Sequence, residues 1–176
     1  NYVVENEERN ALIIKAAKKL VKAGKKVLVL VVRVQHGEAL RDMIEGEGLS
    51  TIFLDGAKSS KKRLAAIDSM KNGEFDIMIA SKIFDQGIDI PELDALILAG
   101  SGKSSGRALQ RIGRVIRKHE GKEKAIVVEF FDNCKYLRSH SEARIKVYKS
   151  EPGFNIIMPK NKVLHVYPKR DAVTWV

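Results

Sequence analysis

Hydrophobic residues along the 176-residue chain form two kinds of segment that alternate from one end to the other. Short, nearly continuous apolar runs, such as residues 27–32, are typical of parallel strands covered on both faces. Longer segments with apolar residues three or four apart predict amphipathic helices. The predicted helices are 7–23, 36–45, 58–71, 104–117 and about 136–149, and the predicted strands are 26–32, 50–54, 75–80, 94–99, 124–130 and 154–157. This order predicts a doubly wound α/β fold, with a mainly parallel sheet, helices on both faces, and function at the carboxyl ends of the strands.

The length fits a single domain. We assign residues 1–158 to that domain and residues 159–176 to a tail, which is either an edge strand or hairpin, or a linker. The first residue is Asn1 rather than methionine, which favours a processed or excised fragment of a longer protein.

A net charge of +10 favours a polyanionic partner but does not choose among nucleic acid, nucleotide and acidic protein. The single cysteine excludes an internal disulfide and fits a reducing compartment, so we expect an intracellular location, cytoplasmic or nucleoid-associated. No apolar run reaches the roughly 20 residues of a membrane span, so we expect no membrane partner.

The densest group of chemically useful side chains is the sequence QRIGRVIR at residues 110–117. On a helix, Gln110, Arg114 and Arg117 share one face, because they are spaced at i, i+4 and i+7. Guanidinium groups make forked contacts to phosphate and stay charged at any working pH. Gly113 costs a helix roughly 1 kcal/mol, which hints at a close contact. The alternative is a solvated basic helix.

A second polar stretch, residues 80–91, lies between two predicted strands and contains the sequence QGIDIP. Gly87 allows a close approach of the backbone to a ligand. Asp89 is a candidate acceptor for a ribose hydroxyl. The alternative is an Asp-Gly turn that Pro91 closes.

Together these two stretches resemble motifs V and VI of superfamily 2 helicases and translocases, in the second, C-terminal RecA-like domain. The resemblance covers about residues 6–128 and includes a strand and loop at 27–37, similar to motif IV, and the turn at Asp55 and Gly56. It is nearest to DNA-repair, restriction and bacteriophage helicases, which favour glutamine at the start of motif VI. The resemblance implies a RecA-like fold and a DNA partner, with RNA possible.

The same resemblance implies roles for individual residues. ATP would lie between this domain and an N-terminal RecA-like domain, with Arg114 and Arg117 as arginine fingers. Gln110 would orient the γ-phosphate or the attacking water, Asp89 would hold the ribose, and Gly87 would let the backbone come close.

The resemblance also places phosphate contacts to the nucleic-acid strand at three strand ends, and the residues there are Arg33, Gly56, Lys58, Ser81 and Lys82. For each lysine taken alone, a solvated surface position is the alternative. His36 is expected to be structural rather than catalytic, because no partner of metal-ligand or triad spacing accompanies it.

The chain contains no P-loop lysine and no acidic DEAD or DEAH tetrad. The sequence GSGKS at 100–104 looks like the end of a P-loop, but Ile97 stands where the pattern needs its first glycine. Mg²⁺ ligands are therefore expected on the N-terminal domain, and this fragment alone is expected to be inactive.

The leading interpretation is the C-terminal motor domain of an ATP-dependent DNA helicase or translocase. The alternative is a nucleic-acid or partner-binding module that has a helicase-like fold without motor activity. A nucleotide-binding α/β transferase would need GxGxxG after the first strand, which residues 32–37 do not offer.

Overall fold

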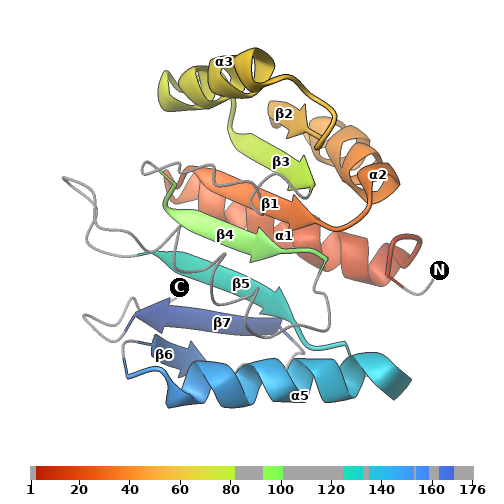
Figure 1. Ribbon diagram of the computed structural model, residues 1–176, viewed down its shortest axis with the longest axis vertical. Coiled ribbons are helices and arrows are strands. Elements are labelled where there is room, and N and C mark those ends of the chain that lie inside the picture. Colours follow the sequence, from red (N-terminus) through yellow and green to blue (C-terminus); the bar gives the residue numbers. More distant parts are fainter. Residues whose placement is uncertain are drawn as a thin grey trace.

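The computed structural model describes residues 3–81, 93–100, 125–132, 135–152, 154–158 and 163–168 (Figure 1). Within these residues the chain forms one seven-stranded sheet with helices on both faces. The predicted helix at 104–117 lies outside the described residues.

The first five strands of the sheet are parallel, and two antiparallel strands extend it on one side. The strand order is β2-β3-β1-β4-β5-β7-β6. The strands are β1 (Val27–Val31), β2 (Thr51–Leu54), β3 (Ile77–Ser81), β4 (Ala95–Leu98), β5 (Ile126–Phe130), β6 (Phe154–Ile157) and β7 (Val163–Pro168).

Among the described residues, two helices cover each face of this sheet. Residues of α1 (Glu7–Lys22) and α2 (Val34–Glu45) share one hydrophobic core with the sheet, and residues of α3 (Ser60–Lys71) and α5 (Lys135–Ser150) share the other. The doubly wound α/β fold that the sequence predicts is therefore confirmed.

Strand β1 shows why an unbroken apolar run was needed at the centre of the sheet. Side chains alternate between the two faces of a strand. Val27, Val29 and Val31 enter the core under α1 and α2, whereas Leu28 and Leu30 enter the core under α3 and α5. All five residues are buried, so a polar residue at any of them would lose its contact with water.

Local signals set the starts of two helices. The Asn6 side chain accepts a hydrogen bond from the Arg9 backbone N–H at 2.8 Å, and the Ser59 hydroxyl accepts one from the Lys62 N–H at 3.4 Å. Such side chains satisfy backbone donors that have no partner inside the helix. Helix α2 differs, because its N-cap residue, Arg33, makes no side-chain capping bond.

Residues 163–168, within the segment assigned to the tail, form strand β7, which makes a hairpin with β6 and is not at the edge of the sheet. Strand β7 pairs with β5 on one side and β6 on the other, antiparallel to both, so β6 is the edge strand. The boundary assigned at residue 158 falls inside the β6–β7 hairpin.

No helix in the described parts of the chain has both the length and the apolar composition that crossing a membrane requires.

Candidate functional site

The carboxyl ends of the parallel strands meet at one edge of the sheet, and the order of the strands determines which loops become neighbours there. Strand β1 lies between β3 and β4, with Val31 opposite Ser81 and Leu30 opposite Leu98. The arrowheads of β1, β3, β4 and β5 point to the same side in Figure 1. The segments that follow β3 and β4 therefore leave the sheet on either side of the segment that follows β1.

The order in which the chain adds strands to the sheet changes direction at β1. Strands β2 and β3 lie on one side of it, and β4 and β5 lie on the other. In α/β sheets, ligands bind outside the carboxyl ends of the strands at such a reversal. The two motif-bearing segments, residues 82–92 and 101–124, begin directly after Ser81 and Gly100 at this edge.

All of the residues assigned to ATP lie outside the described part of the chain. These residues are Gly87, Asp89, Gln110, Arg114 and Arg117. Lys82, assigned to the nucleic-acid strand, also lies outside it. Their roles stay predictions, and only the strand ends to which their segments are attached are placed.

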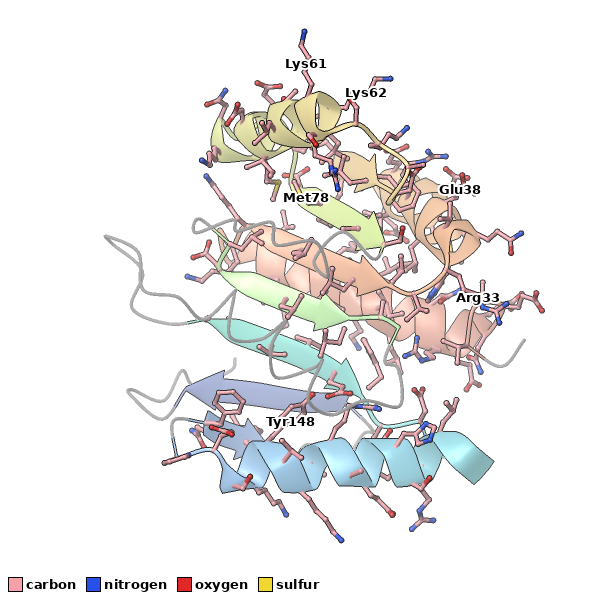
Figure 2. All side chains as sticks on the ribbon, viewed as in Figure 1. Arg33, Glu38, Lys61, Lys62, Met78 and Tyr148 are labelled. Carbon is pink, nitrogen blue, oxygen red and sulfur yellow. The ribbon has the colours of Figure 1, made fainter. Side chains whose placement is uncertain are left out.

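Arg33 is an exposed residue at the carboxyl edge of the sheet, and its phosphate contact stays a prediction. The residue lies at the carboxyl end of β1 and is the N-cap residue of α2 (Figure 2). Arg33 thus stands at the start of a helix, whose first backbone N–H groups also favour anions.

The turn after β2 presents Gly56 and Lys58, and both are exposed. The Asp55 side chain accepts a hydrogen bond from the Ala57 N–H at 2.8 Å, and the Asp55 carbonyl accepts one from the Lys58 N–H at 3.3 Å. Since β2 lies two strands from β1, and neighbouring strands are about 4.8 Å apart, this turn is roughly 10 Å along the edge from the end of β1.

Ser81 differs from the other predicted strand contacts, because its side chain is only 1% exposed. A hydroxyl in that position does not reach a phosphate in solvent without a change in its surroundings. Its contact with the strand stays a prediction.

Gly100 brings the chain that leaves β4 against the end of β1. Its backbone N–H donates to the Leu30 carbonyl at 3.0 Å. A Cβ atom at this position would lie 2.7 Å from the Val32 backbone nitrogen, closer than side chains approach backbone. Only glycine fits here without a shift of the backbone, which gives the glycine at the start of the GSGKS stretch a packing role.

Arg9 is a central residue of this edge that the sequence analysis missed. Its side chain is buried, Nε donates to Asp132 Oδ1 at 2.7 Å, and Nη1 donates to the Ala99 carbonyl at 2.6 Å. Its guanidinium carbon also lies 5.2 Å from the centre of the Phe130 ring, within cation–π range. Arg9 thereby fastens the first turn of α1 to the ends of β4 and β5, the two strands that residues 101–124 connect.

One sequence signal could have identified Arg9. It stands in the first turn of a helix directly after two glutamates, Glu7 and Glu8. The helix dipole disfavours a cation there, so an arginine in that turn suggests a specific buried acceptor.

His36 joins the start of α2 to the start of α1. Its Nε2 lies 2.9 Å from Asn10 Oδ1, and Asn10 Nδ2 donates to the Val4 carbonyl at 3.0 Å. Because the amide nitrogen is already donating, Oδ1 accepts, and the proton of neutral His36 is on Nε2. Burial, and then the charge of Arg9, lower the pKa of His36 to about 4, so the ring is neutral at pH 7. This arrangement fits the expected structural role.

A second buried group continues from Asp132 towards α5. The Asp132 N–H donates to the Ser141 hydroxyl at 3.4 Å, which also accepts from Arg144 Nη2 at 3.2 Å. Arg144 Nε in turn donates to Glu129 Oε1. Burial raises the pKa of Glu129, while the Arg144 charge opposes that rise. Polar contacts therefore brace the edge from α1, over the end of β5, to α5.

Among the described residues, no group of three or more histidine, cysteine, aspartate or glutamate side chains is arranged to hold a metal ion. We assign no step involving Mg²⁺ to these residues.

The parallel strands extend to both sides of β1, and two polar segments follow β3 and β4 at the carboxyl edge of the sheet. This arrangement is that of a RecA-like α/β domain. Residues 9–119 match the helicase conserved C-terminal domain family. This match covers more than half of the 176 residues, and the chain belongs to that family.

Similar proteins include the ATP-dependent DNA helicase UvsW of Enterobacteria phage T4, 32% identical over 168 residues, covering 86% of this chain and 33% of the relative. A putative helicase, 161L, of Invertebrate iridescent virus 6 is 31% identical over 160 residues, covering 84% of this chain and 35% of the relative. The chain thus spans about a third of the length of these relatives.

Solved structures agree with the fold. The crystal structure of T4 UvsW superposes with a TM-score of 0.64 and 28% identity, over 80% of this chain and 32% of that one. The C-terminal domain of the DEAD-box protein Dbp5 superposes with a TM-score of 0.66 over 84% of this chain and 81% of that one, and its 16% identity supports the fold alone.

Proposed function

We propose that the chain is the C-terminal motor domain of an ATP-dependent DNA helicase or translocase. The observation that carries the proposal is the family match over residues 9–119, which includes both QGIDIP and QRIGRVIR. The strand order supports it, because the segments that carry these sequences leave the sheet from β3 and β4, on either side of β1. DNA is the preferred partner because the T4 relative is named a DNA helicase. RNA is the second candidate, since an rRNA helicase, RRP3 of Meyerozyma guilliermondii, is 26% identical over 148 residues.

In the proposed mechanism, ATP lies between this domain and an N-terminal RecA-like domain of the same protein. Arg114 and Arg117 contact the β- and γ-phosphates, where negative charge develops in the transition state. Gln110 orients the γ-phosphate or the attacking water. Asp89 accepts a hydrogen bond from the ribose, and Gly87 allows the backbone to approach. Mg²⁺ neutralises phosphate charge when bound, with its ligands on the N-terminal domain.

The nucleic-acid strand lies across the same edge of the sheet in this proposal. Arg33, Gly56 and Lys58, together with Ser81 and Lys82, bind its phosphates. Phosphate contacts hold a strand without reading its sequence, which suits a motor that moves along it. Closing on ATP and opening after hydrolysis would shift these contacts along the strand.

The bracing at Arg9 and Gly100 supports this mechanism. Arg9 and its partners hold the strand ends on both sides of residues 101–124, and Gly100, directly before that segment, packs against β1. Groups that act on a transition state must be held close to their productive position by their surroundings.

The experiment compares the 176-residue chain with the longer protein that carries the N-terminal domain. Phosphate release is measured with no nucleic acid, with single-stranded DNA and with single-stranded RNA. We expect no turnover by the chain alone, and turnover by the longer protein that DNA stimulates more than RNA. Turnover on the order of 1 s⁻¹ by the chain alone would contradict the divided site, because a complete phosphoryl-transfer site would then be present. Equal or greater stimulation by RNA would reassign the partner, and no stimulated turnover would favour the binding-module alternative.

A further inference from the structure

A groove on the α1–α2 face of the sheet is not used by the proposed motor. It has a volume of about 820 Å³ and is open to solvent. Its walls come from α1 and from the end of α2 with the turn that follows it. This position is on the outer side of the helices, whereas the predicted ATP and strand contacts lie at the carboxyl edge of the sheet.

Lysines dominate the α1 wall of the groove. They are Lys15, Lys18, Lys19 and Lys22. Ile13, Ala17 and Leu20 turn the opposite side of the helix towards the sheet. From Lys15 to Lys22 the wall is about 10 Å long, at 1.5 Å per helical residue. The one acidic residue of the groove, Glu47, forms an ion pair with Lys18, so the lining carries four positive charges against one negative charge.

Apolar side chains lie between the charges. Ile14 on α1 is half-buried, and Met43 on α2 is 40% exposed. Methionine adapts its shape to a partner and is frequent at binding surfaces. The aliphatic stems of the lysines add to the apolar area while their charged ends stay in water.

We propose that this groove binds an acidic amphipathic helix of a partner protein. Its apolar face would cover Ile14 and Met43, and its carboxylates would lie against Lys15 and Lys22. This is the helix-in-groove mode of peptide recognition, with charges that steer the approach.

Charge and chemistry favour this occupant over the alternatives. Nucleic acid would neutralise the lysines, but its phosphate backbone has no apolar group to place on Ile14 and Met43. A second copy of this chain is disfavoured because each copy carries a net charge of +10.

The test measures binding to the 176-residue chain by fluorescence anisotropy. The probe is a labelled synthetic helix of about four turns, with leucine along one face and glutamate on both sides of it. A peptide of the same composition in scrambled order is the first control. The groove variant is Lys15→Glu with Lys22→Glu. Its matched control is Lys61→Glu with Lys62→Glu, which makes the same charge change on α3, where both side chains project into solvent (Figure 2).

We expect the acidic helix to bind more tightly than the scrambled peptide. The groove variant should weaken that binding about tenfold and the α3 variant by less than about twofold. Met43→Ala should weaken peptide binding about threefold, since it removes the apolar contact. Equal binding of the two peptides, or equal effects of the two charge reversals, would overturn the proposal. A groove variant that loses affinity for labelled DNA but not for the peptide would assign the groove to nucleic acid instead.

Discussion

The pairing of Arg9 with Asp132 gives the most direct measure of how firmly the carboxyl edge is held. The two side chains are 7% and 12% exposed, and the Arg9 guanidinium also donates to the Ala99 carbonyl. Removing one partner of a buried ion pair typically costs about 3–5 kcal/mol. Because this pair lies at the rim of the sheet and Asp132 keeps some contact with water, we expect about 3 kcal/mol for Arg9→Ala.

A double-mutant cycle separates the pair from its surroundings. Asp132→Ala leaves Arg9 bonded to the Ala99 carbonyl, so we expect a smaller loss, about 2 kcal/mol. The double variant should lose less than the sum of the two, with a coupling free energy of about 2 kcal/mol. Each of these free-energy changes is a large fraction of the roughly 5–15 kcal/mol that stabilises a domain, so urea unfolding at pH 7 will resolve them.

An exposed pair in the same chain provides the control. On α5, Arg138 Nε lies 2.9 Å from Glu142 Oε1, and the two side chains are 60% and 50% exposed. Exposed pairs four residues apart on a helix couple by about 0.3–0.5 kcal/mol. If the Arg9–Asp132 coupling is no larger than that of Arg138 and Glu142, the buried contact does not exist in solution, and the bracing of the edge is wrong.

Three further predictions concern the same edge. Because the pKa of His36 is lowered to about 4 from a usual 6.5, the unfolded chain binds a proton that the folded chain excludes between these pH values. The free energy of unfolding should therefore fall as the pH drops through this window, by about 1–3 kcal/mol. His36→Gln should flatten this part of the profile in urea titrations, and an unchanged profile would contradict the assignment. Gly100→Ala should destabilise the domain by about 1–3 kcal/mol, whereas Gly56→Ala, where nothing lies within 4 Å, should be nearly neutral, and equal melting temperatures of the two variants would exclude the close approach. Single-stranded DNA should bind with a log K against log salt slope of about −2, and Lys58→Ala and Lys82→Ala should each flatten it by roughly 0.7; a slope near zero would remove phosphate contacts from the account.

The sequence was sufficient to predict the fold wherever a pattern repeats. The unbroken apolar run of β1 and the alternation of helices and strands required a parallel sheet covered on both faces, and the structure contains one. Each of these patterns lies within a short stretch of the chain, so it can be recognised without knowing which distant residues that stretch contacts.

Contacts between distant residues were not predictable in the same way. Arg9 and Asp132 are 123 residues apart, and although the position of Arg9 in the first turn of a helix suggests a buried acceptor, nothing in the sequence identifies that acceptor as Asp132. The place of β7 inside the sheet likewise depends on its pairing with β5 and β6. Of the residues predicted to contact the strand, Arg33, Gly56 and Lys58 are exposed, whereas Ser81 is buried by neighbours that its own sequence context does not specify.

In the proposed mechanism, the arginines of QRIGRVIR act on ATP and not on the nucleic-acid strand. The decisive measurement is steady-state ATP hydrolysis by the longer protein, together with nucleotide-free DNA binding, for Arg114→Ala and Arg117→Ala. We predict that each change lowers turnover by about 10³–10⁵, because an arginine finger stabilises charge that develops in the transition state. ATP binding should weaken far less, DNA affinity should hardly change, and lysine at either position should not restore turnover, because an ammonium lacks the planar fork. Turnover within about tenfold of the unaltered protein, together with a collapse of DNA binding, would contradict the account, because the arginine face would then serve the strand.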